Sequence, residues 1–379
     1  MKNRKKSRNN MPHPEPHIII SGGGTGGHIF PALAIARALQ SKLPDAQILF
    51  IGAKGKMEME KVPAAGFPIK GLWISGLRRE LSPENLMFPL KVLHSLVHAS
   101  YIIRRFKADV AVGVGGFASG PALRAAGMLG IPTLIQEQNS FPGITNKILG
   151  KKASRICVAY EGMEKYFPAK KIIITGNPVR KEIIETEGKK GDAAVFFGLK
   201  TSKKTVFIVG GSQGAYSINT CIEKMLPLLK ENKVQLLWQT GRNFEPRAIE
   251  ACKTAGYEDV KVAGFIQRMD LAYALADIVI SRAGAIAIAE LAAVRKPVIF
   301  IPLPTAAEDH QMKNARRLEE KEAAFVIKDQ DAAEKMPSLL LSLLDDEAIR
   351  KKLEYNIGTF AIADADEKIA DEIIALIKR

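Results

Sequence analysis

Cysteine is scarce in this chain, and long apolar runs are missing from it. The three cysteines, Cys157, Cys221 and Cys252, are widely spaced and odd in number, which fits neither a metal site nor a disulfide framework. We therefore expect a reducing compartment. No stretch approaches about 18 uninterrupted apolar residues, so no transmembrane helix is predicted. The basic segment Met1–Arg8 is not followed by an apolar segment, so a signal peptide is not expected.

Acidic residues are also in deficit, with 40 Asp and Glu against 55 Lys and Arg and a formal net charge of +15. That balance favours anionic partners: nucleic acid, acidic lipid headgroups or phosphorylated substrates. The basic residues are not interleaved with stacking aromatics, which disfavours a nucleic-acid-binding protein with salt-dependent affinity for RNA or DNA. We expect no nucleic-acid partner.

Short apolar runs alternate with helical stretches along the whole chain. The predicted strands of the first half are residues 17–20, 47–51, 110–114, 133–135, 155–159 and 172–175. Those of the second half are residues 205–209, 235–238, 260–263, 278–281, 298–301 and 325–327. Continuous apolar strands that alternate with helices indicate parallel sheets covered on both faces. Two such series predict an α/β chain of two Rossmann-like, doubly wound domains.

The predicted boundary between the domains lies at residues 176–180, where glycine and proline end the last strand of the first series. Residues 1–16, which are basic and then proline-rich, are expected to form a flexible tail. The N-terminal domain is then 17–176 and the C-terminal domain 177–357, and residues 358–379 carry a final helix.

Glycine-rich loops follow three of the predicted strands, at residues 21–28, 113–121 and 210–215, and a fourth loop at 281–285 opens another helix. Glycine lets main-chain amides approach a ligand closely, and a following helix N-terminus favours phosphate. Tight strand-to-helix turns would explain any one of these loops, but they explain the whole set less well.

The first loop formally satisfies the dinucleotide fingerprint G-x-G-x-x-G through Gly22, Gly24 and Gly27. That fingerprint also needs an acidic residue at the end of the second strand, and residues 50–53 contain none. A nicotinamide or flavin enzyme is therefore disfavoured, and no cofactor is expected.

Six motifs taken in order resemble those of the MurG family, UDP-N-acetylglucosamine:N-acetylmuramyl-(pentapeptide) pyrophosphoryl-undecaprenol N-acetylglucosamine transferase. They are residues 23–28 (GGTGGH), 137–139 (EQN), 176–180 (GNPVR), 210–214 (GGSQG), 281–290 (SRAGAIAIAE) and 309–315 (DHQMKNA). Each motif alone is weak, but six in family order over residues 17 to about 330 are specific. Two positions depart from the family pattern: Ala287 replaces a usual threonine and Phe117 a usual tyrosine, which could weaken substrate binding.

The resemblance implies a GT-B glycosyltransferase fold with the active site in the cleft between the domains, and a last helix that packs back on the N-terminal domain. It implies transfer of GlcNAc from UDP-GlcNAc to the C4 hydroxyl of MurNAc in the acceptor lipid I, with inversion, which gives lipid II. It also implies a peripheral location on the cytoplasmic face of the bacterial cell membrane. The alternatives are another GT-B enzyme that uses a UDP-sugar, namely a diacylglycerol glycosyltransferase or a UDP-GlcNAc 2-epimerase.

Carried over by motif, one group of residues would contact the sugar of the donor. Thr25, Gly26 and Gly27 would lie near it with Asn139 close by, and Gln311 would contact sugar hydroxyls.

A second group would bind the nucleotide. Arg180 and Ser212 would serve the nucleotide and its diphosphate, Ile266 would meet the uracil through its backbone, and Ala285 would cap the phosphates. Glu290 would hold the ribose. The alternative for Glu290 is a surface acid on an alanine-rich helix, but a solitary carboxylate among apolar residues would be costly unless paired or near solvent.

Inverting transfer needs a base for the acceptor hydroxyl. His28 is the first candidate because it ends a glycine loop and has an ordinary pKa of about 6.5. Glu137 is the second candidate. A histidine that only packs at the start of the following helix is the structural alternative for His28.

Two segments, 72–79 and 86–91, mix bulky apolar side chains such as Trp73, Leu77 and Phe88 with cations. That mixture suits docking on an anionic membrane surface. Ordinary core with solvated arginines is an equal alternative.

No metal ion is expected to assist the reaction. The pair Asp364 and Asp366 has the spacing of an Asp-x-Asp metal motif, but it lies in a helical stretch with no strand before it. We therefore interpret both as solvated acids at a helix start, on different sides of the helix.

Overall fold

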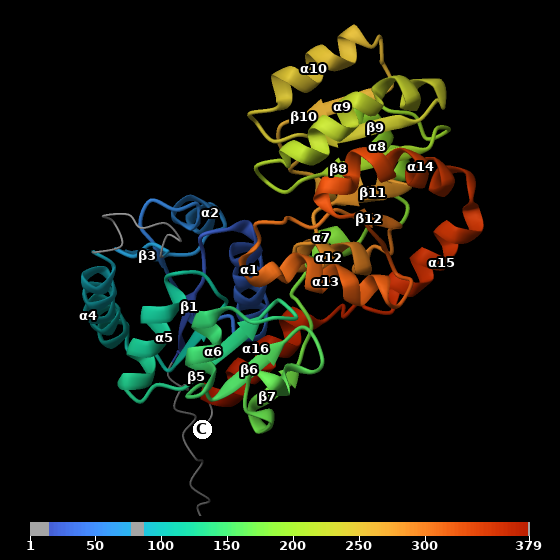
Figure 1. The fold of residues 1–379 in the computed structure, drawn as a ribbon. Coiled ribbons are helices and arrows are strands. Elements are labelled where there is room, and N and C mark those ends of the chain that lie inside the picture. Colours follow the sequence, from blue (N-terminus) through green and yellow to red (C-terminus); the bar gives the residue numbers. More distant parts are fainter. Residues whose placement is uncertain (1–14, 77–86, 378–379) are drawn as a thin grey trace, which may run out of the picture.

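The computed structural model of the chain describes residues 15–76 and 87–377 and contains two lobes, each built on one parallel sheet (Figure 1). The first sheet has seven strands in the order β3-β2-β1-β4-β5-β6-β7. These strands are β1 (His17–Ser21), β2 (Gln47–Ala53), β3 (Ile69–Leu72), β4 (Val110–Gly113), β5 (Thr133–Glu137), β6 (Arg155–Val158) and β7 (Ile172–Ile174).

The second sheet has six strands in the order β10-β9-β8-β11-β12-β13, and all of its pairings are parallel. They are β8 (Thr205–Val209), β9 (Gln235–Gln239), β10 (Val260–Ala263), β11 (Ile278–Ser281), β12 (Val298–Phe300) and β13 (Phe325–Val326). In both sheets the strand order reverses next to the first strand, which is the arrangement of doubly wound folds.

The predicted α/β class with two doubly wound domains is confirmed, and each predicted strand matches an observed one to within a few residues. The sequence prediction missed β3, because only Leu72 of its four residues is buried and Lys70 and Gly71 interrupt the apolar run.

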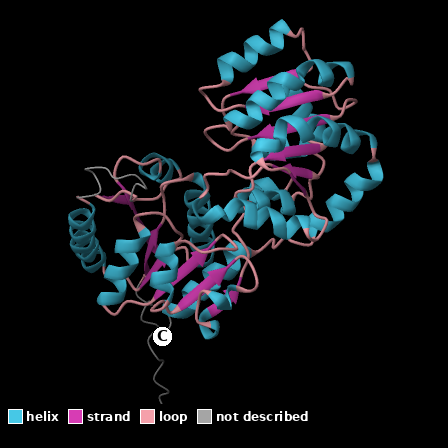
Figure 2. Ribbon diagram, in the orientation of Figure 1, coloured by secondary structure: helices cyan, strands magenta, loops and turns pink. Residues whose placement is uncertain are grey.

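Helices cover both faces of each sheet (Figure 2). Those of the first lobe are α1 (Gly26–Lys42), α2 (Glu58–Ala64), α4 (Phe88–Phe106), α5 (Ser119–Met128) and α6 (Ile144–Gly150), with the short 3-10 helices η1 (Met163–Lys165) and η2 (Ala169–Lys171). Those that follow are α7 (Lys181–Ile184), α8 (Lys190–Phe197), α9 (Tyr216–Glu231), α10 (Glu245–Thr254), α11 (Met269–Leu275), α12 (Ala285–Ala293), η3 (Ala307–Asp309), α13 (His310–Glu319), η4 (Asp329–Asp331), α14 (Ala332–Asp345), α15 (Glu347–Gly358) and α16 (Ala365–Ile377).

The central strands are largely apolar because successive side chains enter opposite cores. Ile18 and Ile20 pack in one core of the first lobe and Ile19 in the other. In β8, Val206 and Phe207 divide between the two cores of the second lobe in the same way. Side chains alternate across a strand, so a sheet with helices on both faces buries every residue of its central strands.

The last helix returns to the first lobe. α16 lies against α1, and Ile369, Ile373 and Leu376 belong to the same core as Ile18 (Figure 1). Most of the predicted tail, residues 1–14, lies outside the described part of the chain. The exact domain limits stay a prediction.

Candidate active site

The sequence-predicted residues collect at the carboxyl edges of the two sheets. β1, β4 and β5 are neighbours, so the two glycine loops after β1 and β4 lie beside Glu137 at the end of β5. In the second lobe, β8 and β11 are neighbours, so the loop with Ser212 lies next to the start of α12 at Ala285. Ligands of doubly wound sheets bind at this edge, where the strand order reverses.

The first glycine loop places Thr25 as the N-cap of α1, followed by Gly26, Gly27 and His28 in its first turn. The Thr25 side chain does not cap the helix; its Oγ1 lies 3.1 Å from Nδ1 of His28. Nδ1 of His28 also lies 3.2 Å from the carbonyl oxygen of Gly23. Burial lowers the pKa of His28 below its ordinary value, while the carboxylate of Glu58 acts in the opposite direction. A lowered pKa keeps the imidazole neutral and therefore able to accept a proton at neutral pH.

The second glycine loop packs directly on the first. A Cβ at Gly115 would lie 2.5 Å from Cδ2 and 2.8 Å from Nε2 of His28, and one at Gly116 would lie 2.2 Å from the Gly23 carbonyl oxygen. Both glycines have left-handed backbones, with φ of +95° and +88°. Any side chain here would displace His28 or the first loop, so glycine is required at both positions.

Glu137 is almost completely buried and bound by amides. Its Oε1 accepts hydrogen bonds from the backbone N–H of Asn139 at 3.0 Å and from that residue's Nδ2 at 3.2 Å, and its Oε2 accepts one from Nδ2 of Asn146 at 2.8 Å. Burial raises the pKa of Glu137, although these bonds favour its charged form. With 2% of its surface exposed, Glu137 offers an acceptor hydroxyl little access in this arrangement.

Asn314 on α13 joins the two lobes next to Glu137. It is fully buried, and its Oδ1 accepts hydrogen bonds from the backbone N–H and the Oγ of Ser140 at 3.1 and 2.8 Å. Its Nδ2 donates to Oδ1 of Asn139 at 3.3 Å. From the sequence, Asn314 was part of a motif but had no assigned role. Its position three residues after Gln311 could have indicated one, because residues one helical turn apart lie on the same side of a helix.

Asn177 makes a second connection in the linker between the lobes. Its Nδ2 donates to the carbonyl oxygen of Gln138 at 3.0 Å and lies 3.5 Å from that of Ala285, and its Oδ1 accepts from Nε2 of Gln136 at 3.0 Å. The side chain of Asn177 therefore contacts both the loop after β5 and the start of α12.

Glu290 is a paired, buried carboxylate, not a surface acid. Its Oε2 accepts a hydrogen bond from the hydroxyl of Tyr273 at 3.0 Å, and its Oε1 lies 3.5 Å from the Arg180 guanidinium. Burial raises the pKa of Glu290, and Arg180 counteracts that shift. Arg180 also stacks on the ring of Phe30 of the first lobe, at 4.8 Å from the ring centroid. The sequence analysis missed Tyr273.

Two other predicted residues, Ile266 and Gln311, already use some of their polar groups, and a third, Ser212, lies at the surface. The backbone N–H of Ile266 donates to Oε1 of Gln239 at 2.9 Å, so a contact of Ile266 with a base would use its carbonyl oxygen. Oε1 of Gln311 accepts from the backbone N–H of Leu303 at 2.9 Å, which leaves its amide nitrogen for a ligand. Ser212 is exposed in the loop after β8.

A cavity of about 570 Å³ opens between α1 and α2 of the first lobe and α7 and α11 of the second. Arg180 lines it, but His28, Glu137 and Gln311 do not, so this cavity coincides with the predicted site only in part. Cations outnumber acids in its lining: Arg37, Lys61, Arg180, Lys189 and Arg268 against Glu182, Glu185 and Asp270.

The prediction that both acids of the Asp-x-Asp pair are solvated is wrong for Asp366. Asp364 is exposed and pairs with Lys368 at 3.0 Å, but Asp366 is buried at the start of α16, and burial raises its pKa. Asp366 belongs to the buried side of α16, the helix that packs against α1, and Lys181 of α7 counteracts the effect of burial on its pKa. Within the described ranges, no three His, Cys, Asp or Glu side chains form a group that could hold a metal ion.

The predicted membrane-docking segments divide between surface and core. Trp73 is 42% exposed, whereas Phe88 is partly buried against a core of the first lobe. Leu77 lies outside the described residues. None of the helices that the structure describes combines the length and apolar content needed to cross a bilayer.

Two family models match the chain: the N-terminal domain of glycosyltransferase family 28 over residues 18–158 and the C-terminal domain over residues 205–369. A protein of Cytophaga hutchinsonii is 52% identical over 368 residues, covering 97% of this chain and 99% of the relative. One of Bacteroides thetaiotaomicron is 50% identical over 364 residues, covering 96% and 98%. Both are named UDP-N-acetylglucosamine--N-acetylmuramyl-(pentapeptide) pyrophosphoryl-undecaprenol N-acetylglucosamine transferase.

Solved structures agree with these relatives. The crystal structure of MurG from Acinetobacter baumannii is similar with a TM-score of 0.75 and 28% identity, covering 96% of this chain and 100% of the other. A UDP-GlcNAc 2-epimerase from Neisseria meningitidis gives a TM-score of 0.67 at 14% identity, covering 95% and 100%, which reflects the shared fold alone.

Proposed function

Because this chain belongs to the MurG family within glycosyltransferase family 28, we propose that it transfers GlcNAc from UDP-GlcNAc to the C4 hydroxyl of MurNAc in lipid I, forming lipid II. The observation that carries this proposal is the 52% identity to a transferase of that name over 97% of the chain. The arrangement of the predicted residues at the facing edges of two sheets supports it.

His28 is the proposed base. His28 as a residue keeps some exposed surface, and the Gly23 carbonyl at Nδ1 leaves Nε2 to accept the proton of the acceptor hydroxyl. The deprotonated oxygen then attacks the anomeric carbon of GlcNAc from the face opposite the diphosphate, so the C–O bond to UDP breaks and the configuration inverts. Glu137 is better suited to hold Asn139, because its carboxylate oxygens already accept three amide hydrogen bonds.

The departing UDP carries negative charge that the second lobe is suited to stabilise. The first turn of α12, at Ala285, presents backbone N–H groups and the positive end of the helix dipole. Arg180 adds a cation beside Glu290. We propose that these groups, with the loop amides at Ser212, serve the diphosphate, that Glu290 binds the ribose, and that Gln311 binds sugar hydroxyls.

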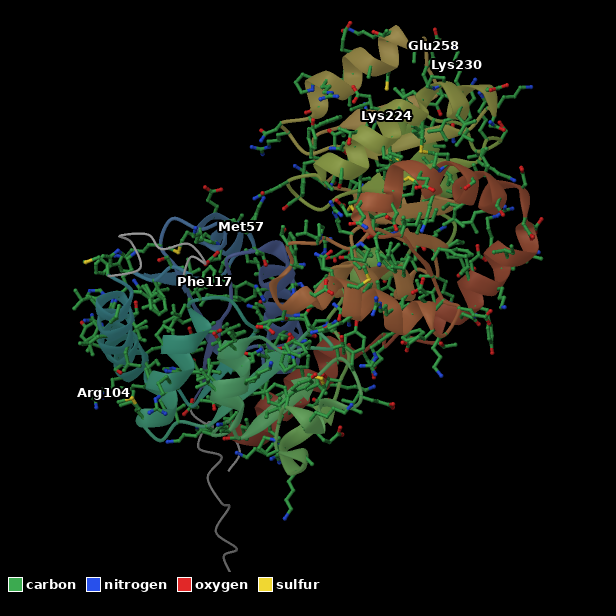
Figure 3. The ribbon with its side chains drawn as sticks, viewed as in Figure 1. Met57, Arg104, Phe117, Lys224, Lys230 and Glu258 are labelled. Carbon is green, nitrogen blue, oxygen red and sulfur yellow. The ribbon has the colours of Figure 1, made fainter. Side chains whose placement is uncertain are left out.

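We further propose that α4 docks on an anionic membrane, where the lipid tail of the acceptor resides. Leu90, Leu93, Val97 and Tyr101 are each 56–64% exposed and recur at intervals of three or four residues, so they form one apolar side of the helix. Two arginines occupy its last turn, and Arg104 projects from the outer edge of the lobe (Figure 3). Apolar side chains beside cations suit a peripheral position on an acidic bilayer surface.

The decisive experiment is incubation of the chain with radiolabelled UDP-GlcNAc and a lipid I analogue. We expect label in a lipid II analogue and release of UDP. Incubation with UDP-GlcNAc alone should leave the sugar unchanged, whereas conversion to UDP-ManNAc would identify an epimerase. Labelled diacylglycerol in a mixture of acceptors would identify a lipid glycosyltransferase instead.

A further inference from the structure

Glu58, the first residue of α2, is a fully buried carboxylate that the proposed reaction does not use directly. Its Oε2 accepts a hydrogen bond from the backbone N–H of Gly24 at 2.9 Å, and its Oε1 accepts one from the backbone N–H of Ala53 at 3.0 Å. Both partners are main-chain groups and not cations. Burying a carboxylate is costly, so its oxygens need such donors.

Two glycines make room for this carboxylate. A Cβ at Gly23 would lie 2.3 Å from the Glu58 carboxyl group, and one at Gly52 would lie 2.6 Å from its Cγ. Glu58 therefore lies in a space bounded by the end of β2 and the first glycine loop. The sequence has no acidic residue at the end of β2 itself. In the structure, the carboxylate of Glu58, five residues after Ala53, lies at that end of the strand.

The bond to Gly24 connects Glu58 to His28 through a single peptide group. The N–H of Gly24 and the C=O of Gly23 belong to the same trans peptide and point in opposite directions. On one side the N–H donates to Glu58, and on the other side the carbonyl oxygen lies 3.2 Å from Nδ1 of His28. A carbonyl oxygen can only accept, so a hydrogen bond between it and Nδ1 requires the proton on Nδ1 and leaves Nε2 with its lone pair. The Thr25 hydroxyl, 3.1 Å from the same Nδ1, can act as a second acceptor in this arrangement.

We propose that Glu58 is a positioning residue that holds the Gly23–Gly24 peptide and, through it, keeps His28 in the tautomer with a free Nε2. A peptide between two glycines rotates easily. A flipped peptide would turn its N–H toward Nδ1, so that Nδ1 would become the acceptor and Nε2 would carry the proton. It would also turn its carbonyl oxygen toward the Glu58 carboxylate, and that repulsion opposes the flip. This inference rests on the proposed role of His28 as the base.

The charge of Glu58 acts in the same direction. Of the charged groups that act on His28, Glu58 on α2 stabilises the imidazolium formed when the base takes a proton, and His310 on α13 opposes it. Loss of the carboxylate should therefore make His28 a weaker base and also allow its proton to move from Nδ1 to Nε2.

Glu58→Gln tests the proposal, because it keeps the size of the side chain but removes the charge and places an amide NH₂ against one of the two N–H donors. Glu60→Gln, at an exposed position of the same helix, is the matched control. We expect Glu58→Gln to lower kcat roughly 10- to 100-fold, by analogy with the loss of hydrogen-bond partners that orient metal-ligating histidines. Donor affinity by calorimetry and the activity of Glu60→Gln should stay near those of the unmodified chain.

The double variant separates positioning from general damage. In a His28→Ala background, Glu58→Gln should cause no further loss of kcat, because Glu58 acts through His28. Additive losses, or an unchanged kcat in the single variant, would overturn the proposal.

A second measurement does not depend on whether the Glu58→Gln variants fold. ¹⁵N NMR of the full chain labelled at its six histidines, with His28→Ala to assign the resonances, reports the tautomer directly at a pH where His28 is neutral. We expect a protonated Nδ1 and a bare Nε2. A main population with the proton on Nε2 would overturn the proposal. The tautomer does not depend on transfer, so a failed transfer assay would refute the proposed function and leave this result standing.

Discussion

The bridge at Asn314 provides a direct test of whether contact between the lobes supports the chemistry. Asn314→Ala removes three hydrogen bonds and leaves the N–H and Oγ of Ser140 and the Oδ1 of Asn139 without their partner from α13. Asn139 in turn donates to Glu137, so the loss reaches the loop after β5. We expect a lower kcat without loss of the fold.

The expected size follows from burial. A buried polar group left without a partner costs about 1–3 kcal/mol. Asn314 is fully buried, but Ser140 and Asn139 are only partly buried, so water replaces some of the lost bonds. A net cost of about 1–2 kcal/mol to the joined arrangement corresponds to a roughly 5- to 30-fold lower ratio of joined to separated lobes. If only the joined arrangement is active, that factor is the largest loss of kcat that we expect.

Steady-state kinetics at saturating donor and acceptor, together with thermal melting, provide the assay. Glu319→Ala, at an exposed position of α13, is the control and should change neither quantity. Ser140→Ala removes one of the three bonds and should give a smaller loss than Asn314→Ala. A lower melting temperature with unchanged kcat would show that the bridge contributes only to stability and would refute the reasoning.

His28→Ala should lower kcat by roughly 10²–10⁴-fold. Because burial lowers the pKa of His28 and the base must be neutral, kcat/KM should rise with pH through a value below 6.5 and then level off; near-normal turnover of the variant would shift the assignment to Glu137. Glu290→Gln should raise the donor KM, and unchanged donor affinity by calorimetry would remove Glu290 from the nucleotide site. The double variant Leu93→Ser/Val97→Ser should reduce binding to anionic vesicles while soluble acceptors are still used, whereas Val195→Ser, at an even more exposed apolar position on α8, should not; equal binding by both would count against docking through α4. Transfer to a soluble acceptor should persist after EDTA treatment, and activity that is lost on chelation and restored by Mg²⁺ or Mn²⁺ would contradict the assignment of leaving-group stabilisation to Arg180 and main-chain amides.

The strands and their glycine loops were predictable because the information for them is local. A central strand of a doubly wound sheet, such as Ile18–Ile20 or Val206–Val209, is buried on both faces and therefore reads as an apolar run. The edge strand β3 was not predictable in this way, because only Leu72 of its residues is buried. The glycines at 115 and 116 were visible as a motif, but the reason for them, the close approach of His28 and Gly23, was not.

What the sequence alone determined was the fold class, the order of the strands along the chain and the set of residues that belong to the family's motifs. Only the tertiary structure decided which of those residues meet, because burial and pairing depend on elements far apart in the chain. Glu58 reaches the loop at Gly24 from the next helix, Glu290 is neutralised by Arg180 from 110 residues away, and Asn314 joins a loop 174 residues before it. Asp366, which looked like a solvated acid, is buried for the same reason: it starts a helix that packs on the first lobe, and Lys181 of α7, 185 residues earlier, is the cation that acts on it.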